Sequence, residues 1–248
     1  MQAVLDAGPG RHNRPMQKKE DHRTRVAAER RERMRRRLFE SALQLAAEKG
    51  PAATSIDDVI QAAEVSRGTF YKYFDAPDAL FDALALEVAN EIIRMAEPAV
   101  SPIADPAQKV ATGMRLVIQL AMGRREVAAF LVRLGWPGVR NGQVLLDFVQ
   151  RDLEQGMKQR RFMPLPVPLA LNIVSMTVLG SVHAMLGMRS PRDFAEQAVA
   201  SALRALGVEA KEALKLATRD LPAPQPVVQG LIESGSAARA VRRAARPN

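Results

Sequence analysis

The chain has 248 residues, of which 47% are hydrophobic and 25% charged, an ordinary balance for a folded globular protein. It has no cysteine, which excludes disulfides and thiolate metal sites. The formal net charge is +9: residues 1–37 hold 12 Lys and Arg against 5 Asp and Glu, and the last fifteen residues hold four Arg and no acid. Basic ends on a nearly neutral body indicate a nucleic-acid partner, although Arg-rich ends that only maintain solubility stay an alternative.

Composition favours helices throughout the chain. Aromatic residues make up only 4%, Ala, Leu, Met and Arg are common, and no window alternates apolar and polar residues as a strand does. We therefore predict an all-α fold. The first thirty residues lack the apolar core of a secretory signal, so a cytoplasmic location is expected.

The N-terminal third predicts an arm followed by four helices. Residues 1–28 carry scattered charges and little hydrophobic periodicity, which predicts a disordered basic arm. A first helix is expected over 29–49, ended by Gly50, which can adopt the left-handed conformation. The second helix opens with a capping-box variant at 54–57, and the third, capped by Ser66, ends near Phe74. The fourth begins at a proline and covers 77–97.

The remaining two thirds predict a second helical region. Pro98, Pro102 and Pro106 mark a linker and the expected domain boundary. From residue 221 onward Pro, Gly, Ser and Arg predominate, so 221–248 is expected to be a flexible basic tail. Between linker and tail, apolar spacing and Pro or Gly breaks predict helices at 107–122, 124–134, 142–161, 167–188 and 191–206, with a short amphipathic piece at 208–220.

One apolar segment has two interpretations. Residues 162–188 contain no Asp, Glu, Lys or Arg, which is typical of a membrane span. Three prolines shorten the unbroken stretch to about 20 residues, the minimum for spanning, and several polar residues fall within it. We therefore favour a buried or interface helix over a membrane span.

Residues 54–74 have the pattern of a helix-turn-helix, two short helices joined by a tight turn after a longer supporting helix. At 100° per residue, Phe70 and Phe74 fall on one side of the second helix and should pack inward. The opposite side carries Gly68, Thr69 and Lys72, which suits a DNA groove because glycine permits close approach and the polar groups can contact bases or phosphates.

Residues 54–74 read Thr-Ser-Ile-Asp-Asp-Val-Ile-Gln-Ala-Ala-Glu-Val-Ser-Arg-Gly-Thr-Phe-Tyr-Lys-Tyr-Phe, and residues 78–81 read Asp-Ala-Leu-Phe. Together, these two segments resemble the DNA-binding signature of the TetR (tetracycline repressor-like) family. The resemblance covers about residues 33–90. It implies a homodimer whose recognition helices enter successive major grooves of a palindromic operator, and a C-terminal domain that binds a small molecule and thereby loosens DNA binding. By position, it implies DNA contacts from Thr54, Ser66, Arg67, Gly68, Thr69, Tyr71, Lys72 and Tyr73.

One position departs from the family pattern. Pro77 stands where the family commonly has a lysine that contacts phosphate, so one contact is expected to be missing. The Arg-rich lead-in could compensate, and we predict phosphate contacts from Arg33 and Arg37. The alternative is that several of these arginines form a solvated helix face.

These elements define the predicted domains. We expect a helix-turn-helix DNA-binding domain with its connecting helix at 29–97 and a larger helical domain for effector binding and dimerisation at 98–220. The apolar, small-residue-rich helix 167–188 and the helix 191–206 are predicted to form a four-helix dimer seam, with an intramolecular core as the alternative. Candidate effector-contacting residues, each of which could also be ordinary core, are Met114, Phe130, Trp136, Phe148, Met176 and His183.

Catalysis is not expected. The sequence shows no nucleophile with a base, no metal-ligand cluster and no phosphate-binding glycine loop, so we predict no enzyme activity, no cofactor and no metal. The expected function is a DNA-binding transcriptional regulator, with repression relieved by a small apolar effector. A DNA-binding regulator without a small-molecule switch and a helical protein-interaction module stay open as alternatives.

Overall fold

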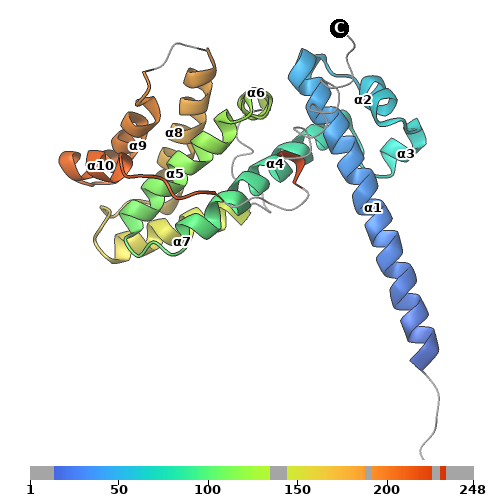
Figure 1. The fold of residues 1–248 in the computed structure, drawn as a ribbon, viewed down its shortest axis with the longest axis horizontal. Helices are drawn as coiled ribbons and strands as arrows, with labels where there is room; N and C mark the ends of the chain where they lie inside the picture. The colour runs from blue at the N-terminus through green and yellow to red at the C-terminus, as the bar shows by residue number, and fades with distance from the viewer. Residues whose placement is uncertain (1–13, 135–143, 188–190, 225–229, 233–248) are drawn as a thin grey trace, which may run out of the picture. The chain divides into compact units, whose positions relative to one another are not determined.

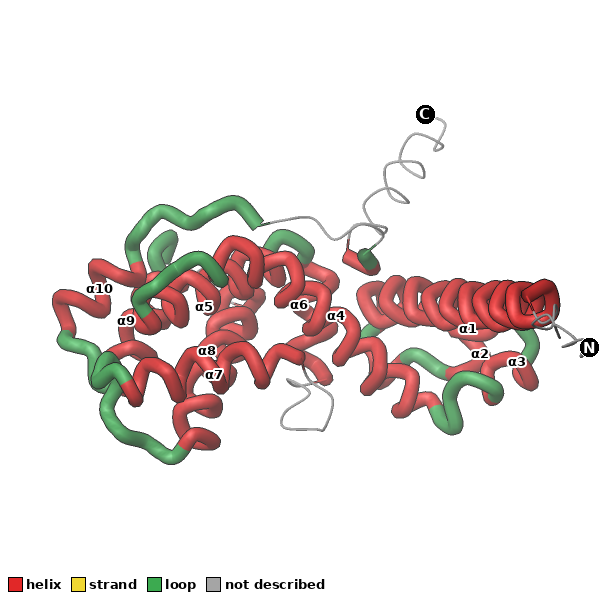
Figure 2. Tube along the Cα trace, turned by 90° about the horizontal axis from the view of Figure 1, so that it is seen from below, coloured by secondary structure: helices red, strands yellow, loops and turns green. Residues whose placement is uncertain are grey.

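The computed structural model describes residues 14–134, 144–187, 191–224 and 230–232. The regular secondary structure of these residues is helical, as Figure 2 shows, and the all-α prediction is confirmed. By their contacts the residues group into two units, Met1–Arg37 and Leu38–Asn248. The second unit contains the helix-turn-helix and the larger helical domain described below.

Helix α1 (Arg14–Lys49) begins much earlier than predicted. The expectation of a disordered arm over 1–28 is therefore wrong for residues 14–28, while residues 1–13 lie outside the described part. The segment lacks hydrophobic periodicity, but it is rich in Lys, Arg, Glu and Ala, which favour helices. An i,i+4 pair with Arg25 Nε 3.6 Å from a Glu29 carboxylate oxygen adds local support. Extending an existing helix costs little, so propensity alone suffices here.

The small domain is built on the end of α1, a 3-10 turn (Pro51–Ala53), α2 (Ile56–Ala63), α3 (Arg67–Tyr71) and the start of α4 (Pro77–Val100). Gly50 ends α1 with a φ of 88°, the left-handed conformation predicted for it. The elements share one apolar core of fully or nearly fully buried side chains, including Leu38, Phe39, Val59, Phe70, Phe74, Leu80 and Phe81.

Helix α4 continues past the predicted boundary. Pro98 lies inside it rather than in a linker, and the helix ends at Val100. A proline in the last turn removes one N–H donor, but α4 packs along its length against α5, α6 and α7, and this burial compensates for the lost bond. The proline signal therefore marked the end of the helix one turn too early.

The larger domain is arranged around α5 (Pro106–Met122), which contacts α4 and every later helix (Figure 1). Most of its residues are buried, including the polar Gln108 and Thr112. The helix predictions for this region are confirmed within a few residues. The surrounding helices are α6 (Arg125–Leu134), α7 (Val144–Lys158), α8 (Val167–Gly187), α9 (Phe194–Ala205) and α10 (Ala210–Ala217).

Helix α8 is long and apolar enough to cross a membrane by length and composition, yet it packs against α5, α6, α7 and α9. Its buried side is formed by small and β-branched residues such as Ala170, Val174 and Val178. Only 28% of its most apolar window is buried, because the opposite side, with Leu169 and Met176 about half exposed, meets no partner among the described residues. The helix thus has one packed face and one open apolar face.

A polar cluster joins three parts of the larger domain. Asp105 caps α5, and Arg161 donates to both of its carboxylate oxygens at 2.8 and 2.9 Å. The same guanidinium donates to Glu212 of α10 at 2.8 Å. Such bidentate, charge-assisted contacts hold a loop in a defined geometry. The neighbouring guanidinium holds the pKa of Asp105 below its ordinary value.

The C-terminal segment Gly230–Ile232 is docked on α4, which corrects the prediction of a flexible tail for these residues; 225–229 and 233–248 lie outside the described part. Leu231 and Ile232 are each 6% exposed. Their backbone N–H groups donate to the two carboxylate oxygens of Glu91, at 2.6 and 3.0 Å. Glu91 is only 1% exposed, and burial raises the pKa of its carboxyl.

Candidate nucleic-acid interface and effector cavity

The helix-turn-helix begins at a complete capping box. Ser55 Oγ accepts from the Asp58 N–H at 3.2 Å, and the Asp58 carboxylate accepts from the Ser55 N–H at 2.8 Å. Lys49 Nζ lies 2.6 Å from the same carboxylate and lowers the pKa of Asp58 well below its ordinary value. The box starts at Ser55 rather than at Thr54, one residue later than predicted. It ties the end of α1 to the first turn of α2.

The turn between α2 and α3 orients the second helix. Glu64 adopts a left-handed conformation with φ 50°, and the Val65 N–H donates to the Ile60 carbonyl at 3.0 Å. Ser66 then caps α3 by accepting from the Thr69 N–H. Left-handed backbone is uncommon for glutamate and ends α2 abruptly. The two helices are therefore joined by the tight turn that the motif requires.

Phe70 and Phe74 anchor α3, as predicted. Phe70 is fully buried and Phe74 is 7% exposed. Their ring centroids lie 6.0 Å apart, and the Phe74 ring lies 5.7 Å from that of Phe39 on α1. Helix α3 itself ends at Tyr71, although the Phe74 N–H still donates to the Phe70 carbonyl. Because one side is held in this aromatic cluster, the other side of α3 has a defined orientation.

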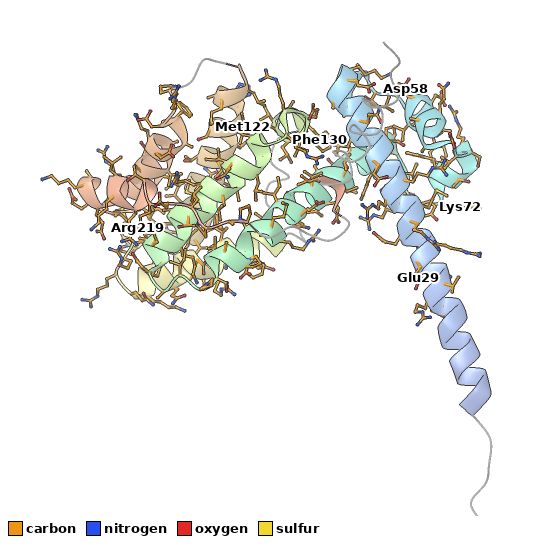
Figure 3. The ribbon with its side chains drawn as sticks, viewed as in Figure 1. Glu29, Asp58, Lys72, Met122, Phe130 and Arg219 are labelled. Carbon is orange, nitrogen blue, oxygen red and sulfur yellow. The ribbon has the colours of Figure 1, made fainter. Side chains whose placement is uncertain are left out.

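The outward side of α3 carries Gly68, Tyr71 and Lys72, and all three are exposed. Tyr71 is 46% exposed, and its ring is nearly perpendicular to that of Phe70 with 5.5 Å between the ring centroids, so a large aromatic side chain is held at the surface. Among the described residues, the nearest neighbour of a Cβ added at Gly68 would be Ser66 Oγ at 4.0 Å, so the backbone here is open. Figure 3 labels Lys72 at the end of this element. Aromatic, cationic and open backbone groups are thus brought together on one short face.

Three further predicted contact residues are engaged within the protein. Arg67 pairs with Asp57 at 2.5 Å, with both side chains mostly exposed, and this pairing raises its pKa. Thr69 and Ser66 share a hydrogen bond between their hydroxyls at 2.9 Å. An exposed ion pair is weak in water, so Arg67 can exchange Asp57 for a phosphate. Ser66 and Thr69 have local structural roles in addition to any contact with DNA.

The remaining residues that were predicted to contact DNA differ in how exposed they are. Thr54 is only 6% exposed, and its hydroxyl donates to the Gly50 carbonyl at 2.8 Å, so its first role is to stabilise the turn. Tyr73 is half-buried. Arg33 and Arg37 belong to the N-terminal unit and are exposed, with Arg33 Nε donating to the Glu29 carbonyl. Pro77 is the first residue of α4, as predicted, and supplies no charge.

A cavity lies in the larger domain between α4, α5, α7 and α8. The cavity is partly open to solvent. The walls are mainly apolar, and charged groups come from Glu97, Lys109, Arg151 and Asp152. Its principal apolar residues are Ile93, Val110, Met114, Val117, Phe148 and Val178.

Two of the six predicted effector residues, Met114 and Phe148, line this cavity. Phe130 does not, because it is buried in the core with its ring 6.5 Å from that of Phe81. Met176 is 51% exposed and His183 is also exposed, both on the open side of α8. Trp136 lies outside the described residues. Residue type and helix assignment alone could not tell which face of α8 turns toward the cavity.

Sequence reasoning missed the charged residues of the cavity. Lys109 and Asp152 are charged residues on otherwise apolar helix faces. This break in the apolar pattern is the feature of the sequence from which they could have been identified. Lys109 Nζ lies 3.6 Å from Asp152 Oδ1, and the two side chains are only 14% and 11% exposed. A buried pair of this kind is uncommon enough to indicate a specific role.

A helix-turn-helix held by an aromatic cluster is joined through α4 to a larger helical domain that contains a cavity. Family models agree: residues 38–84 match the bacterial regulatory proteins of the tetR family, and residues 105–219 match the tetracyclin repressor-like C-terminal domain. The two matches together cover more than half of the chain. The protein belongs to the TetR family.

Similar proteins support this assignment. RolR crystallised with resorcinol has 28% sequence identity and a TM-score of 0.68, over 80% of this chain and all of RolR. A tetR family transcription regulator from Shewanella sp. PV-4, at 19% identity over 71% of this chain and 99% of its own and TM-score 0.60, shares the fold. An uncharacterised HTH-type transcriptional regulator of Mycobacterium tuberculosis (strain CDC 1551 / Oshkosh) is 24% identical over 44% of this chain. The chain spans about half the length of the curated relatives it matches.

Proposed function

We propose that the protein is a transcriptional repressor that leaves a palindromic operator when a small molecule binds its larger domain. The observation that carries the DNA-binding part is the exposed face of Gly68, Tyr71 and Lys72 on a helix anchored by Phe70 and Phe74. Glycine allows the backbone to approach the groove, tyrosine can contact a thymine methyl or a phosphate, and lysine can donate to guanine or phosphate. The positions named by the family pattern, including Thr54, Ser66, Arg67, Thr69 and Tyr73, complete the proposed contact set.

Basic residues before the motif supply the proposed sequence-independent attraction. Arg33 and Arg37 are exposed and belong to a unit that carries most of the excess positive charge. Each phosphate that a cation neutralises steepens the salt dependence of binding by about 0.9 in log–log slope. These residues compensate for the phosphate contact that Pro77 does not make.

The proposed active form is a homodimer formed through α8 and α9. The open side of α8 presents Leu169 and Met176, and Ser201 and Ala205 are exposed on α9. Leu203 and Leu206, in contrast, are buried within the chain itself. Two such faces related by a two-fold axis would bury their apolar side chains and place two recognition helices for a palindrome.

The effector is proposed to occupy the cavity between α4, α5, α7 and α8. Its apolar walls with a few polar groups are typical of small-molecule sites. RolR binds resorcinol, and its likeness to this chain extends over the whole of RolR. Helix α4 both lines the cavity and begins directly after the helix-turn-helix, so a ligand that moves α4 can alter DNA binding.

The DNA-binding proposal is tested by Tyr71→Ala combined with Lys72→Ala. Operator fragments recovered from DNA that co-purifies with the protein provide the probe. We expect the double variant to bind at least tenfold more weakly at physiological salt, since each specific contact contributes about 1–3 kcal/mol. Lys158→Ala, an exposed lysine of α7, removes the same charge elsewhere and should leave binding unchanged.

Unchanged operator affinity of the double variant would show that α3 is not the recognition helix. A protein that binds its operator equally well with and without every cavity ligand would be a regulator without a small-molecule switch. A solution mass of one chain would refute the dimer and the palindromic operator together.

A further inference from the structure

The cavity has one polar feature that the proposed function does not explain. Lys109 on α5 and Asp152 on α7 face each other in its wall, with 3.6 Å between Nζ and Oδ1. Arg151 Nε lies 3.6 Å from the same oxygen. These distances bring the charges together but exceed the length of a hydrogen bond.

The result is a buried carboxylate oxygen that is neutralised but not hydrogen-bonded. Asp152 is 8% exposed, and Oδ1 is fully buried with no hydrogen-bond partner among the described residues. Buried acceptors in folded proteins nearly always have a donor, and the exceptions call for a functional explanation. A molecule that enters the cavity and brings an O–H or N–H group would supply that donor after a small side-chain rotation.

The charges in the wall restrict what this molecule can be. Glu97 and Asp152 carry negative charge, and Lys109 and Arg151 carry positive charge, so the formal charges cancel. An anionic ligand would be attracted by the two cations but repelled by the two carboxylates. A neutral ligand meets no such opposition and loses little hydration on entering.

A hydroxyl group fits this pair better than other neutral groups. Its hydrogen can be donated to Asp152 while its oxygen accepts from the Lys109 ammonium, so one atom satisfies both partners. The rest of the ligand would contact apolar side chains, among them Met114 and Phe148. Neither an ether nor a hydrocarbon can donate to the carboxylate.

Resting on the effector function proposed above, we propose that Lys109 and Asp152 select neutral hydroxylated ligands with an apolar skeleton, and that Asp152 is the hydrogen-bond acceptor for the ligand hydroxyl. The pair is a specificity-determining site rather than only a structural ion pair.

The experiment compares matched probes on the full-length protein by calorimetric titration. Phenol, resorcinol and 1-naphthol carry a hydroxyl; anisole, 1,3-dimethoxybenzene and 1-methoxynaphthalene have the same rings without a donor; benzoate carries a negative charge. We expect the hydroxylated member of at least one pair to bind about tenfold to a hundredfold tighter than its methyl ether, as for a hydrogen bond to a charged group. Benzoate should bind more weakly than phenol.

The variants Asp152→Asn and Lys109→Met test the residues. Asparagine keeps the size of the side chain but loses the charge, so the preference for hydroxyl over methyl ether should fall at least fivefold in Asp152→Asn. Ser175→Ala, which removes a cavity hydroxyl outside the pair, should keep the preference. A ratio between two probes does not change when a variant is merely less stable, and each variant's unfolding temperature identifies any that fails to fold. In that case Lys109→Met supplies the same test from the other partner.

Equal binding of the hydroxylated and methylated probes would overturn the proposal, as would an undiminished preference in Asp152→Asn. Tightest binding of benzoate would show an anion site instead. Failure of every hydroxylated probe to bind would also overturn it. Operator binding measured in parallel separates the two proposals, since a protein that binds DNA but ignores these probes keeps its regulatory function and loses only the proposed ligand class.

Discussion

The contact between Gly230 and Glu91 supports a sharp prediction about stability. A Cβ added to Gly230 would lie 1.8 Å from Glu91 Oε1 and 2.6 Å from its Cδ, far inside any permitted contact. Glu91 cannot simply turn away, because it is 1% exposed and its oxygens accept from the N–H groups of Leu231 and Ile232. We therefore expect Gly230→Ala to detach residues 230–232 from α4.

The size of the effect follows from what the segment loses. Burial of one leucine and one isoleucine contributes about 4 kcal/mol together, toward the lower end of the usual range. Two hydrogen bonds to a carboxylate add about 4 kcal/mol. Ordering the backbone and side chains of three residues costs about 6 kcal/mol. The net loss on detachment is about 2 kcal/mol, which for a chain of this size lowers the unfolding temperature by about 4–8 °C.

The assay is thermal and urea unfolding followed by circular dichroism, with hydrogen exchange at Leu231 and Ile232 as a local measurement. Both amides should exchange slowly in the wild type and rapidly in Gly230→Ala. Gly68→Ala is the matched control, since a Cβ there has its nearest neighbour at 4.0 Å and should leave stability unchanged or slightly raised. An unfolding temperature within 1 °C of wild type together with unchanged exchange at both amides would refute the reasoning.

Three further predictions concern the other elements. Phe70→Ala removes a fully buried ring and should lower the free energy of unfolding by about 3–5 kcal/mol, whereas Tyr71→Ala should lower it by less than about 1 kcal/mol. Equal losses for the two variants in urea unfolding would contradict the assignment of the inward and outward faces of α3. Arg161 lowers the pKa of Asp105 in the folded state, so their interaction stabilises the protein above the ordinary aspartate range, and this stabilisation is lost as the pH falls through the lowered pKa. Arg161→Met should therefore make the loss of stability between about pH 5 and 3 less steep. An unchanged dependence of stability on pH would contradict this coupling. Met176→Lys should place a charge on the open face of α8. The mass of the protein in analytical ultracentrifugation should then shift from that of a dimer to that of a monomer, with unchanged helix content. A variant that stays dimeric would show that the dimer interface lies elsewhere.

Local sequence signals predicted most of the helices and the core of the helix-turn-helix. Phe70 and Phe74 were assigned inward from spacing alone, because helical periodicity is a local property and their burial follows from it. Gly50 and Pro77 were assigned as helix ends for the same reason, since backbone conformation at these residues depends on their own chemistry. The sequence predicted that the helix ends before Pro98, whereas α4 continues to Val100. Packing of α4 against neighbouring helices outweighs the tendency of proline to end a helix, and local sequence patterns contain no information on this packing.

Tertiary structure alone decided which residues meet across long separations. Met114 lines the cavity while Met176 faces outward, and identical residue types on similar apolar helices cannot distinguish the two. The approach of Lys109 to Asp152 and the docking of Leu231 and Ile232 on Glu91 depend on how whole helices pack. Such contacts arise from the summed burial of many side chains. Local sequence patterns therefore determined the helices of this protein and the exposed face of α3. The packing of these helices against one another decided the cavity and the position of the C-terminal segment.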